Sequence, residues 1–231
     1  MNEKGYTNPQ LVMTPAELHE RLNDPKLCLI DTRPVEEFVQ GHIPGAAHFD
    51  LFGISLNDTS PAPLASFIWM MESLLASRGV DWDKTVVFYE ENSGVRAARG
   101  FWLLEYMGHE DVHILDGGIK AWLAAGLPVT SEVKAPSRGR FQGKRHEEYN
   151  ASYTDILERL GKNEVAILDT RSDGEYYGQL VRAARGGTIP GSVHIEWLQN
   201  LDENGAFKKA DDLKALYASK GITPDKEIVC F

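Results

Sequence analysis

The sequence predicts an α/β protein made of two copies of one unit, each a mainly parallel sheet flanked by helices. Two observations lead to this prediction. Short apolar runs of strand type alternate with longer segments of helical spacing, and one stretch of this pattern returns about 140 residues later. Alternating strands and helices favour a parallel sheet, because the crossover helices cover both of its faces.

The repeat consists of two pairs of similar segments. Residues 27–50 (LCLIDTRPVEEFVQGHIPGAAHFD) return as residues 165–196 (VAILDTRSDGEYYGQLVRAARGGTIPGSVHIE). The second copy is eight residues longer, and we place the additional residues in a loop around LVRAARGG. Residues 76–89 (ASRGVDWDKTVVFY) align without gaps with residues 218–231 (ASKGITPDKEIVCF).

This repeat predicts two domains and the elements within them. We expect a first domain over residues 1–134, a linker over 135–150 and a second domain over 151–231. The linker prediction rests on a polar stretch with Pro and Gly and no clear period. Strands are predicted at LCLID, TVVFY, VHIL, VAILD and EIVCF. Helices are predicted at LASFIWMMESLLASRG and AARGFWLLEYMG, each closed by a C′ glycine.

The composition is that of an acidic globular protein. The 231 residues are 42% hydrophobic and carry a formal net charge of -10. Nucleic acid and anionic membranes are not expected as partners, since an acidic surface repels both. There is no apolar run of about 18 residues and no secretory signal, so we predict a cytoplasmic protein.

Cys28 and Cys230 lie in apolar strand-like runs, where we expect buried thiols rather than a disulfide or a metal site.

The loop after residues 85–89 is the first candidate for chemistry. In a parallel sheet, loops at the carboxyl ends of the strands form the binding crevice. This loop reads EENSGVRAAR, with Gly94 before a helix start and Arg96 in its first turn. Successive backbone N–H groups at such a helix start bind an anion, or lower the pKa of a thiol. The ungapped alignment places Glu90 opposite position 232, one residue beyond Phe231.

Three motifs in this order resemble the rhodanese family: LIDTRPVEEFVQGHIPGAAHFD, EENSGVRAAR and VHILDGGIKAW. The two copies are similar to tandem-domain sulfurtransferases of the thiosulfate or 3-mercaptopyruvate type. The resemblance implies a catalytic cysteine directly after the TVVFY-type strand. Glu90 has that place in the first domain, which is therefore expected to be inactive, with Glu90, Gly94 and Arg96 in a degenerate loop.

The same resemblance implies that the catalytic cysteine stands at position 232. No catalytic residue is then expected within the chain given, and the second domain is expected to be incomplete, truncated before its active-site loop. By comparison with the first copy, the missing part is on the order of 40 residues. We expect the 231-residue polypeptide to have an exposed sheet edge and low stability.

The implied reaction is a double displacement. A thiolate takes the outer sulfur of thiosulfate or mercaptopyruvate as a persulfide, and a thiol or cyanide removes it. Neither a metal nor an organic cofactor is expected. The anionic group of the donor calls for arginine, and the candidates are Arg171, Arg182 and Arg185.

Arg171, Glu175 and Asp169 could each have a structural role instead of a role in catalysis. Arg171 either contacts the donor or forms an ion pair with Asp169 or Glu175. Glu175 either positions the active loop or, as we favour, closes an S-x-x-E capping box with Ser172. Asp169 is expected to accept hydrogen bonds at the end of its strand. His42, His48 and His194 are expected to satisfy backbone groups.

Thiosulfate sulfurtransferase is the leading functional hypothesis. 3-Mercaptopyruvate sulfurtransferase is the closest alternative, because the residues that would separate the two follow position 232. A phosphatase of similar fold would need a longer loop with Cys and Arg five residues apart. A non-catalytic binding or regulatory module is also possible, since Glu90 already replaces the thiol in one copy.

Overall fold

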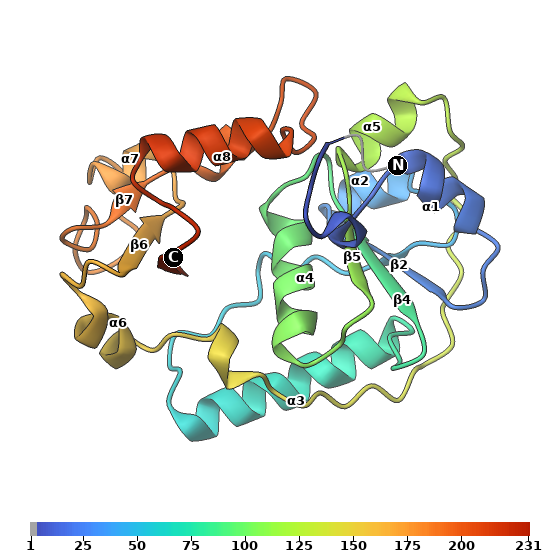
Figure 1. Cartoon of the computed structure of the whole chain (residues 1–231). Coiled ribbons are helices and arrows are strands. Elements are labelled where there is room, and N and C mark those ends of the chain that lie inside the picture. The colour runs from blue at the N-terminus through green and yellow to red at the C-terminus, as the bar shows by residue number, and fades with distance from the viewer. Residues whose placement is uncertain (1–3) are drawn as a thin grey trace. The chain divides into compact units, whose positions relative to one another are not determined.

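The computed structural model describes residues 4–231 and divides them into two compact units (Figure 1). The larger unit contains Asn8–Tyr149 and Glu203–Phe207. The smaller unit contains residues 4–7, Asn150–Asp202 and Lys208–Phe231. Residues 135–149, which the sequence predicted as a linker, thus group with the larger unit.

The larger unit is built on a five-stranded sheet in which all paired strands are parallel. The strand order is β1-β5-β4-β2-β3. The strands are Val12–Met13 (β1), Leu27–Asp31 (β2), Ala47–His48 (β3), Thr85–Tyr89 (β4) and Val112–Leu115 (β5). The helices are Pro9–Leu11 (η1), Pro15–Arg21 (α1), Val35–Gln40 (α2), Pro61–Ser77 (α3), Val95–Tyr106 (α4), Gly118–Ala124 (α5) and Glu147–Tyr149 (η2).

Helices cover both faces of this sheet, as its parallel pairing requires. All five residues of β4 are buried, and their side chains alternate between two hydrophobic clusters. Val86 and Phe88 pack with residues of α3 and α4. Val87 and Tyr89 pack on the other face with residues of α1, α2 and α5. The prediction of a covered parallel sheet is confirmed for this unit.

The two long predicted helices end as their glycines indicated. Gly79 and Gly108 follow the C-caps of α3 and α4 with φ of 92° and 83°. A left-handed backbone at C′ favours glycine because a Cβ is strained there.

The smaller unit repeats the centre of this sheet with three parallel strands in the order β7-β6-β8. The strands are Val165–Asp169 (β6), Val193–His194 (β7) and Glu227–Cys230 (β8). The helices are Tyr153–Arg159 (α6), Asp173–Tyr176 (α7), Trp197–Asn200 (η3) and Ala210–Ser219 (α8). Leu29 pairs with Val87 in the larger unit, and Ile167 pairs with Val229 in the smaller, so the register follows the sequence repeat.

One prediction about the core is wrong. Cys230, expected to be a buried thiol, is exposed on β8, an edge strand on which Val229 is buried and Ile228 is 43% exposed. In the larger unit α4 packs on the corresponding face of β4. Residues 4–231 contain no second copy of that helix, and this leaves the thiol accessible.

Candidate active site

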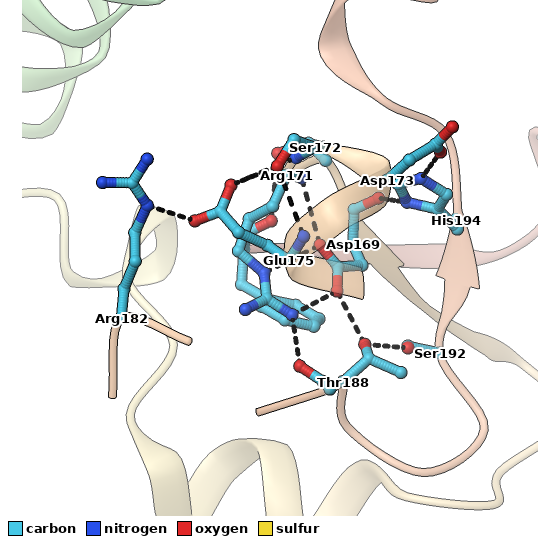
Figure 2. Close-up of polar contacts among 12 residues, drawn as sticks. Asp169, Arg171, Ser172, Asp173, Glu175, Arg182, Thr188, Ser192 and His194 are labelled. Atoms are coloured by element: carbon cyan, nitrogen blue, oxygen red, sulfur yellow. Dashed lines mark hydrogen bonds and ion pairs between the residues drawn. The ribbon is translucent and has the colours of Figure 1, made fainter. Parts of the chain in front are cut away.

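The site in the smaller unit is organised by three successive residues at the end of β6 (Figure 2). Asp169 is fully buried and accepts hydrogen bonds from the backbone N–H of Arg171 (3.0 Å), its Nε (3.0 Å) and its Nη2 (2.6 Å). Nη2 also donates to the carbonyl of Gly187 at 2.9 Å. Arg171 is therefore held in one orientation by an acid two residues before it and by a loop carbonyl.

The same three residues hold Phe231, the residue after β8. The backbone N–H and the hydroxyl of Thr170 both donate to the Phe231 carbonyl, at 2.9 and 3.0 Å. The guanidinium carbon of Arg171 lies 5.1 Å from the centroid of the Phe231 ring. We call Asp169, Thr170 and Arg171 the Asp-Thr-Arg clamp, because together they fix the residue before position 232.

The larger unit contains an equivalent clamp. Arg33 binds Asp31 (Nη2 to Oδ2, 2.7 Å) and the Gly41 carbonyl (2.8 Å). Its guanidinium carbon lies 5.9 Å from the Tyr89 ring centroid. Thr32 donates to the Tyr89 carbonyl from its N–H and its hydroxyl, both at 2.9 Å. Both copies of the repeat thus contain the clamp. It holds the residue before position 90 in the larger unit and the residue before position 232 in the smaller unit.

Charge at Asp169 is stabilised within the site. Burial by itself raises the pKa of this carboxyl, but hydrogen bonds from Arg171 and Thr188 outweigh it and hold the pKa below its ordinary value. The Thr188 hydroxyl donates to Asp169 Oδ2 at 2.6 Å and lies 2.7 Å from the Ser192 hydroxyl. Figure 2 shows these two side chains beside the carboxylate, in the loop that carries the second copy's additional residues.

The capping box predicted for Ser172 and Glu175 is present at the start of α7. The Glu175 carboxylate accepts the Ser172 hydroxyl at 2.7 Å and the Arg182 Nε at 3.0 Å. The Ser172 hydroxyl is the main reason why the pKa of Glu175 lies below its ordinary value. Arg182 is 70% exposed and Arg185 is also exposed, so both lie on the outer surface of this loop.

The loop after β4 shows what stands at the corresponding place in the larger unit. Glu90 Oε1 accepts the backbone N–H groups of Arg96 (2.6 Å) and Ala97 (3.2 Å), which we call the nest. The carboxylate therefore sits at the positive end of α4, a 12-residue helix. Burial raises the pKa of Glu90 despite these two hydrogen bonds. The sequence predicted an anion-binding loop, and in this unit its own Glu90 carboxyl group occupies the N–H donors.

The remaining residues of this loop keep the nest tight. A Cβ on Gly94 would lie 2.6 Å from Glu90 Oε1, so a side chain there would displace the carboxylate. Arg96 lies in the first turn of α4, where its guanidinium binds Asp50 at 2.5 Å and stacks on Phe52. Gly94 and Arg96 thus serve the packing of the loop around Glu90.

Neither cysteine of the chain has the surroundings of an activated thiol. Burial raises the pKa of Cys28 to about 12. Nearby protein atoms raise the pKa of Cys230 by desolvation as well, although its side chain is partly accessible. An activated thiol needs the opposite shift.

The histidines have the structural role that the sequence predicted. In each, a ring nitrogen donates a hydrogen bond to a backbone carbonyl: His42 to Phe38, His48 to Arg33 and His194 to Asp169. Among residues 4–231 no three His, Cys, Asp or Glu side chains are grouped so that they could hold a metal ion.

Sequence reasoning missed three hydroxyl groups of the site. Thr170 had a signal, because both copies contain Asp-Thr-Arg. Thr188 and Ser192 had no such signal in the sequence, since their position beside Asp169 depends on the path of an irregular loop.

Two stretches of the chain, residues 14–125 and 152–231, match the family model described as rhodanese-like domain. The chain belongs to this family and contains two such domains. Thiosulfate sulfurtransferase from Azotobacter vinelandii is 39% identical over 97% of this chain and 83% of its own length. The 3-mercaptopyruvate sulfurtransferase of Escherichia coli K12 is 30% identical over 92% of this chain and 80% of its own length.

A solved structure agrees with this assignment. SseA from Escherichia coli, described with the "rhodanese" fold of 3-mercaptopyruvate sulfotransferases, superimposes with a TM-score of 0.83. The match covers 95% of this chain and 87% of that one at 28% identity. These named relatives are sulfurtransferases, which supports sulfur transfer as the activity of this chain. No helix in residues 4–231 is long and apolar enough to cross a membrane.

Proposed function

We propose that the protein transfers sulfane sulfur from thiosulfate to cyanide or a thiol, through a persulfide on a cysteine at position 232. One observation carries the proposal: Thr170 binds the Phe231 carbonyl in the same way as Thr32 binds the Tyr89 carbonyl. Position 232 is therefore equivalent to position 90, the residue after Tyr89. The two backbone N–H groups that donate to Glu90 support the idea that this loop offers hydrogen-bond donors to the side chain at that position. A thiolate needs such donors.

The reaction divides into two sulfur transfers. The thiolate attacks the outer sulfur of thiosulfate, a sulfur–sulfur bond forms at the cysteine, and the bond to the departing sulfite breaks with its electron pair. Cyanide or a thiolate then attacks the outer sulfur of the persulfide, and the cysteine leaves as thiolate. No electrons are exchanged with an outside oxidant or reductant, so the cycle needs no metal and no organic cofactor.

The roles of the arginines follow from their contacts. Arg182 and Arg185 are exposed on the loop whose Gly187 carbonyl binds Arg171, and we propose that they contact the anionic end of the donor. Arg171 uses Nε and Nη2 on Asp169 and Gly187, so we propose that it acts on the donor through its charge. Asp169 and Glu175 support these roles, because Asp169 holds Arg171 and Glu175 holds Arg182 by ion pairs.

The test uses the polypeptide extended beyond Phe231 with its natural residues. We expect cysteine at position 232, thiocyanate production from thiosulfate and cyanide, and a gain of one sulfur atom on that residue by mass spectrometry. Serine at position 232 should abolish both signals. A natural residue other than cysteine there would exclude the persulfide mechanism and favour a binding or regulatory module.

The second candidate donor is 3-mercaptopyruvate, which the similarity to the Escherichia coli relative favours. The two donors differ in their anionic end, a sulfonate-like group in one and a carboxylate in the other. A comparison of kcat/KM for thiosulfate and mercaptopyruvate on the extended polypeptide separates them, and a higher value for mercaptopyruvate reverses our assignment. A cytoplasmic location stays a prediction.

A further inference from the structure

The carbonyl of Phe231 receives two hydrogen bonds from a single residue. Thr170 donates from its N–H at 2.9 Å and from its hydroxyl at 3.0 Å. In a polypeptide extended beyond Phe231, this carbonyl would belong to the peptide group that leads to residue 232. Thr32 makes the same pair of contacts to Tyr89, at the peptide group that leads to Glu90.

The second hydrogen bond is not needed to build the sheet. A backbone N–H from any residue other than proline would satisfy the carbonyl at the end of a parallel strand. The hydroxyl adds a donor that valine, of nearly the same shape, would lack. Thr32 is completely buried, so its hydroxyl also depends on this carbonyl for a partner.

Two donors on one carbonyl have two effects on the residue that follows. They fix the plane of the peptide group, and hence the direction in which the next side chain leaves the strand. They also draw electron density toward the oxygen, which makes the N–H on the other side of the peptide bond a stronger donor. Both effects act on Glu90 in the larger unit and on residue 232 in the smaller unit.

The larger unit shows the result of this arrangement. The Tyr89 carbonyl is held by Thr32, and the next carbonyl, that of Glu90, accepts the N–H of Ile119 at 2.8 Å. With carbonyls fixed on both sides, the Glu90 side chain points into the nest. A Cβ on Gly118 would collide with the Glu90 carbonyl, so this approach is close.

We propose that Thr170 is a positioning residue, which holds the Phe231 carbonyl with its N–H and hydroxyl and thereby aims the side chain at position 232 into the following loop. The inference rests on the proposed function, because it assigns Thr170 a role in orienting the sulfur-carrying cysteine. It predicts an effect on thiol chemistry in addition to stability.

The experiment compares Thr170→Val, Thr170→Ser and Thr32→Val in the extended polypeptide. Thr32→Val is the matched control, since it removes the same hydrogen bond in the unit without a nucleophile. The readouts are kcat with thiosulfate and cyanide, the pH midpoint of alkylation at position 232 by iodoacetamide, and the melting temperature. Thr170→Ala replaces Thr170→Val if the latter does not fold.

Thr170→Val should lower kcat about tenfold, the effect of one lost hydrogen bond. The alkylation midpoint should rise by about one pH unit. Thr170→Ser should restore both values, and Thr32→Val should lower the melting temperature without changing either. Equal losses of melting temperature in both valine variants, with kcat and the midpoint unchanged, would overturn the inference. If the unmodified polypeptide gains no sulfur at position 232, the proposed function itself fails, and this inference fails with it.

Discussion

At the scale of single residues, the two clamps differ in how far water reaches their ion pairs. The side chains of Asp31 and Arg33 are 0% and 7% exposed. Asp169 is also 0% exposed, but Arg171 is 34% exposed. Removal of the acid leaves a buried, unpaired guanidinium in the first clamp and a partly hydrated one in the second.

We therefore expect Asp31→Asn to lower the free energy of unfolding by about 3 kcal/mol or more. Asp169→Asn should have a smaller effect, because water solvates the Arg171 that remains. Urea denaturation of both variants gives the comparison. Glu132→Gln, which breaks an exposed pair with Lys134, is the control and should have almost no effect. Equal losses in the two clamp variants would contradict the role assigned to burial.

A second residue-scale prediction concerns Glu90, whose pKa lies above its ordinary value of 4.5 because of burial. A raised pKa means that the folded state binds the proton more tightly than the unfolded state. The resulting stability is complete below about pH 4.5 and is lost as pH rises through the folded pKa.

Glu90→Gln removes this dependence, since glutamine does not titrate. The stability of the unmodified protein relative to Glu90→Gln should thus fall as pH rises from about 4.5 toward neutral. Urea midpoints measured across that interval provide the test. Glu91→Gln, on the exposed neighbour in the same loop, is the matched control. A constant difference would show that Glu90 titrates alike in both states.

At the scale of elements, helices approach the sheets at distances that the sequence does not reveal. A Cβ on Gly100 of α4 would lie 2.5 Å from the ring of Phe88, which is fully buried in β4. A Cβ on Gly174 of α7 would have its nearest neighbour at 3.6 Å. Both glycines are helical, so helix propensity alone predicts that alanine stabilises both.

Packing should reverse that expectation at one site. Gly100→Ala should destabilise the protein by about 1 to 3 kcal/mol because α4 must move away from β4. Gly174→Ala should be neutral or stabilise it by up to about 1 kcal/mol. Thermal denaturation of the two variants separates packing from propensity, and stabilisation by Gly100→Ala would refute the close approach.

At the scale of the whole molecule, the two cysteines differ in their exposure. In the 231-residue polypeptide Cys230 is exposed and Cys28 is buried. We expect Cys230 to react with a thiol reagent in the native state and Cys28 only after unfolding. Peptide mapping after alkylation identifies the modified residue.

Extension of the chain beyond Phe231 should slow the reaction of Cys230 and raise the melting temperature. We expect the added residues to include a counterpart of α4, which would cover the apolar face of β8 that Ile228 and Cys230 now expose. Equal melting temperatures and equal reaction rates would show that this face is covered in another way.

The repeat, the parallel α/β architecture and the capping box at Ser172 could be predicted from the sequence, and so could a candidate site at the ends of the strands. These features depend on local patterns, such as apolar periodicity, caps and turn glycines, or on the comparison of two copies of one pattern. The sequence did not reveal which side chains contact one another in the folded protein. The tertiary structure placed Glu90 in the nest, Thr170 on the Phe231 carbonyl and Thr188 on Asp169, and it grouped Glu203–Phe207 with the larger unit. These contacts join residues between 6 and 61 positions apart in the chain, and their geometry depends on how the helices and loops pack against the sheet.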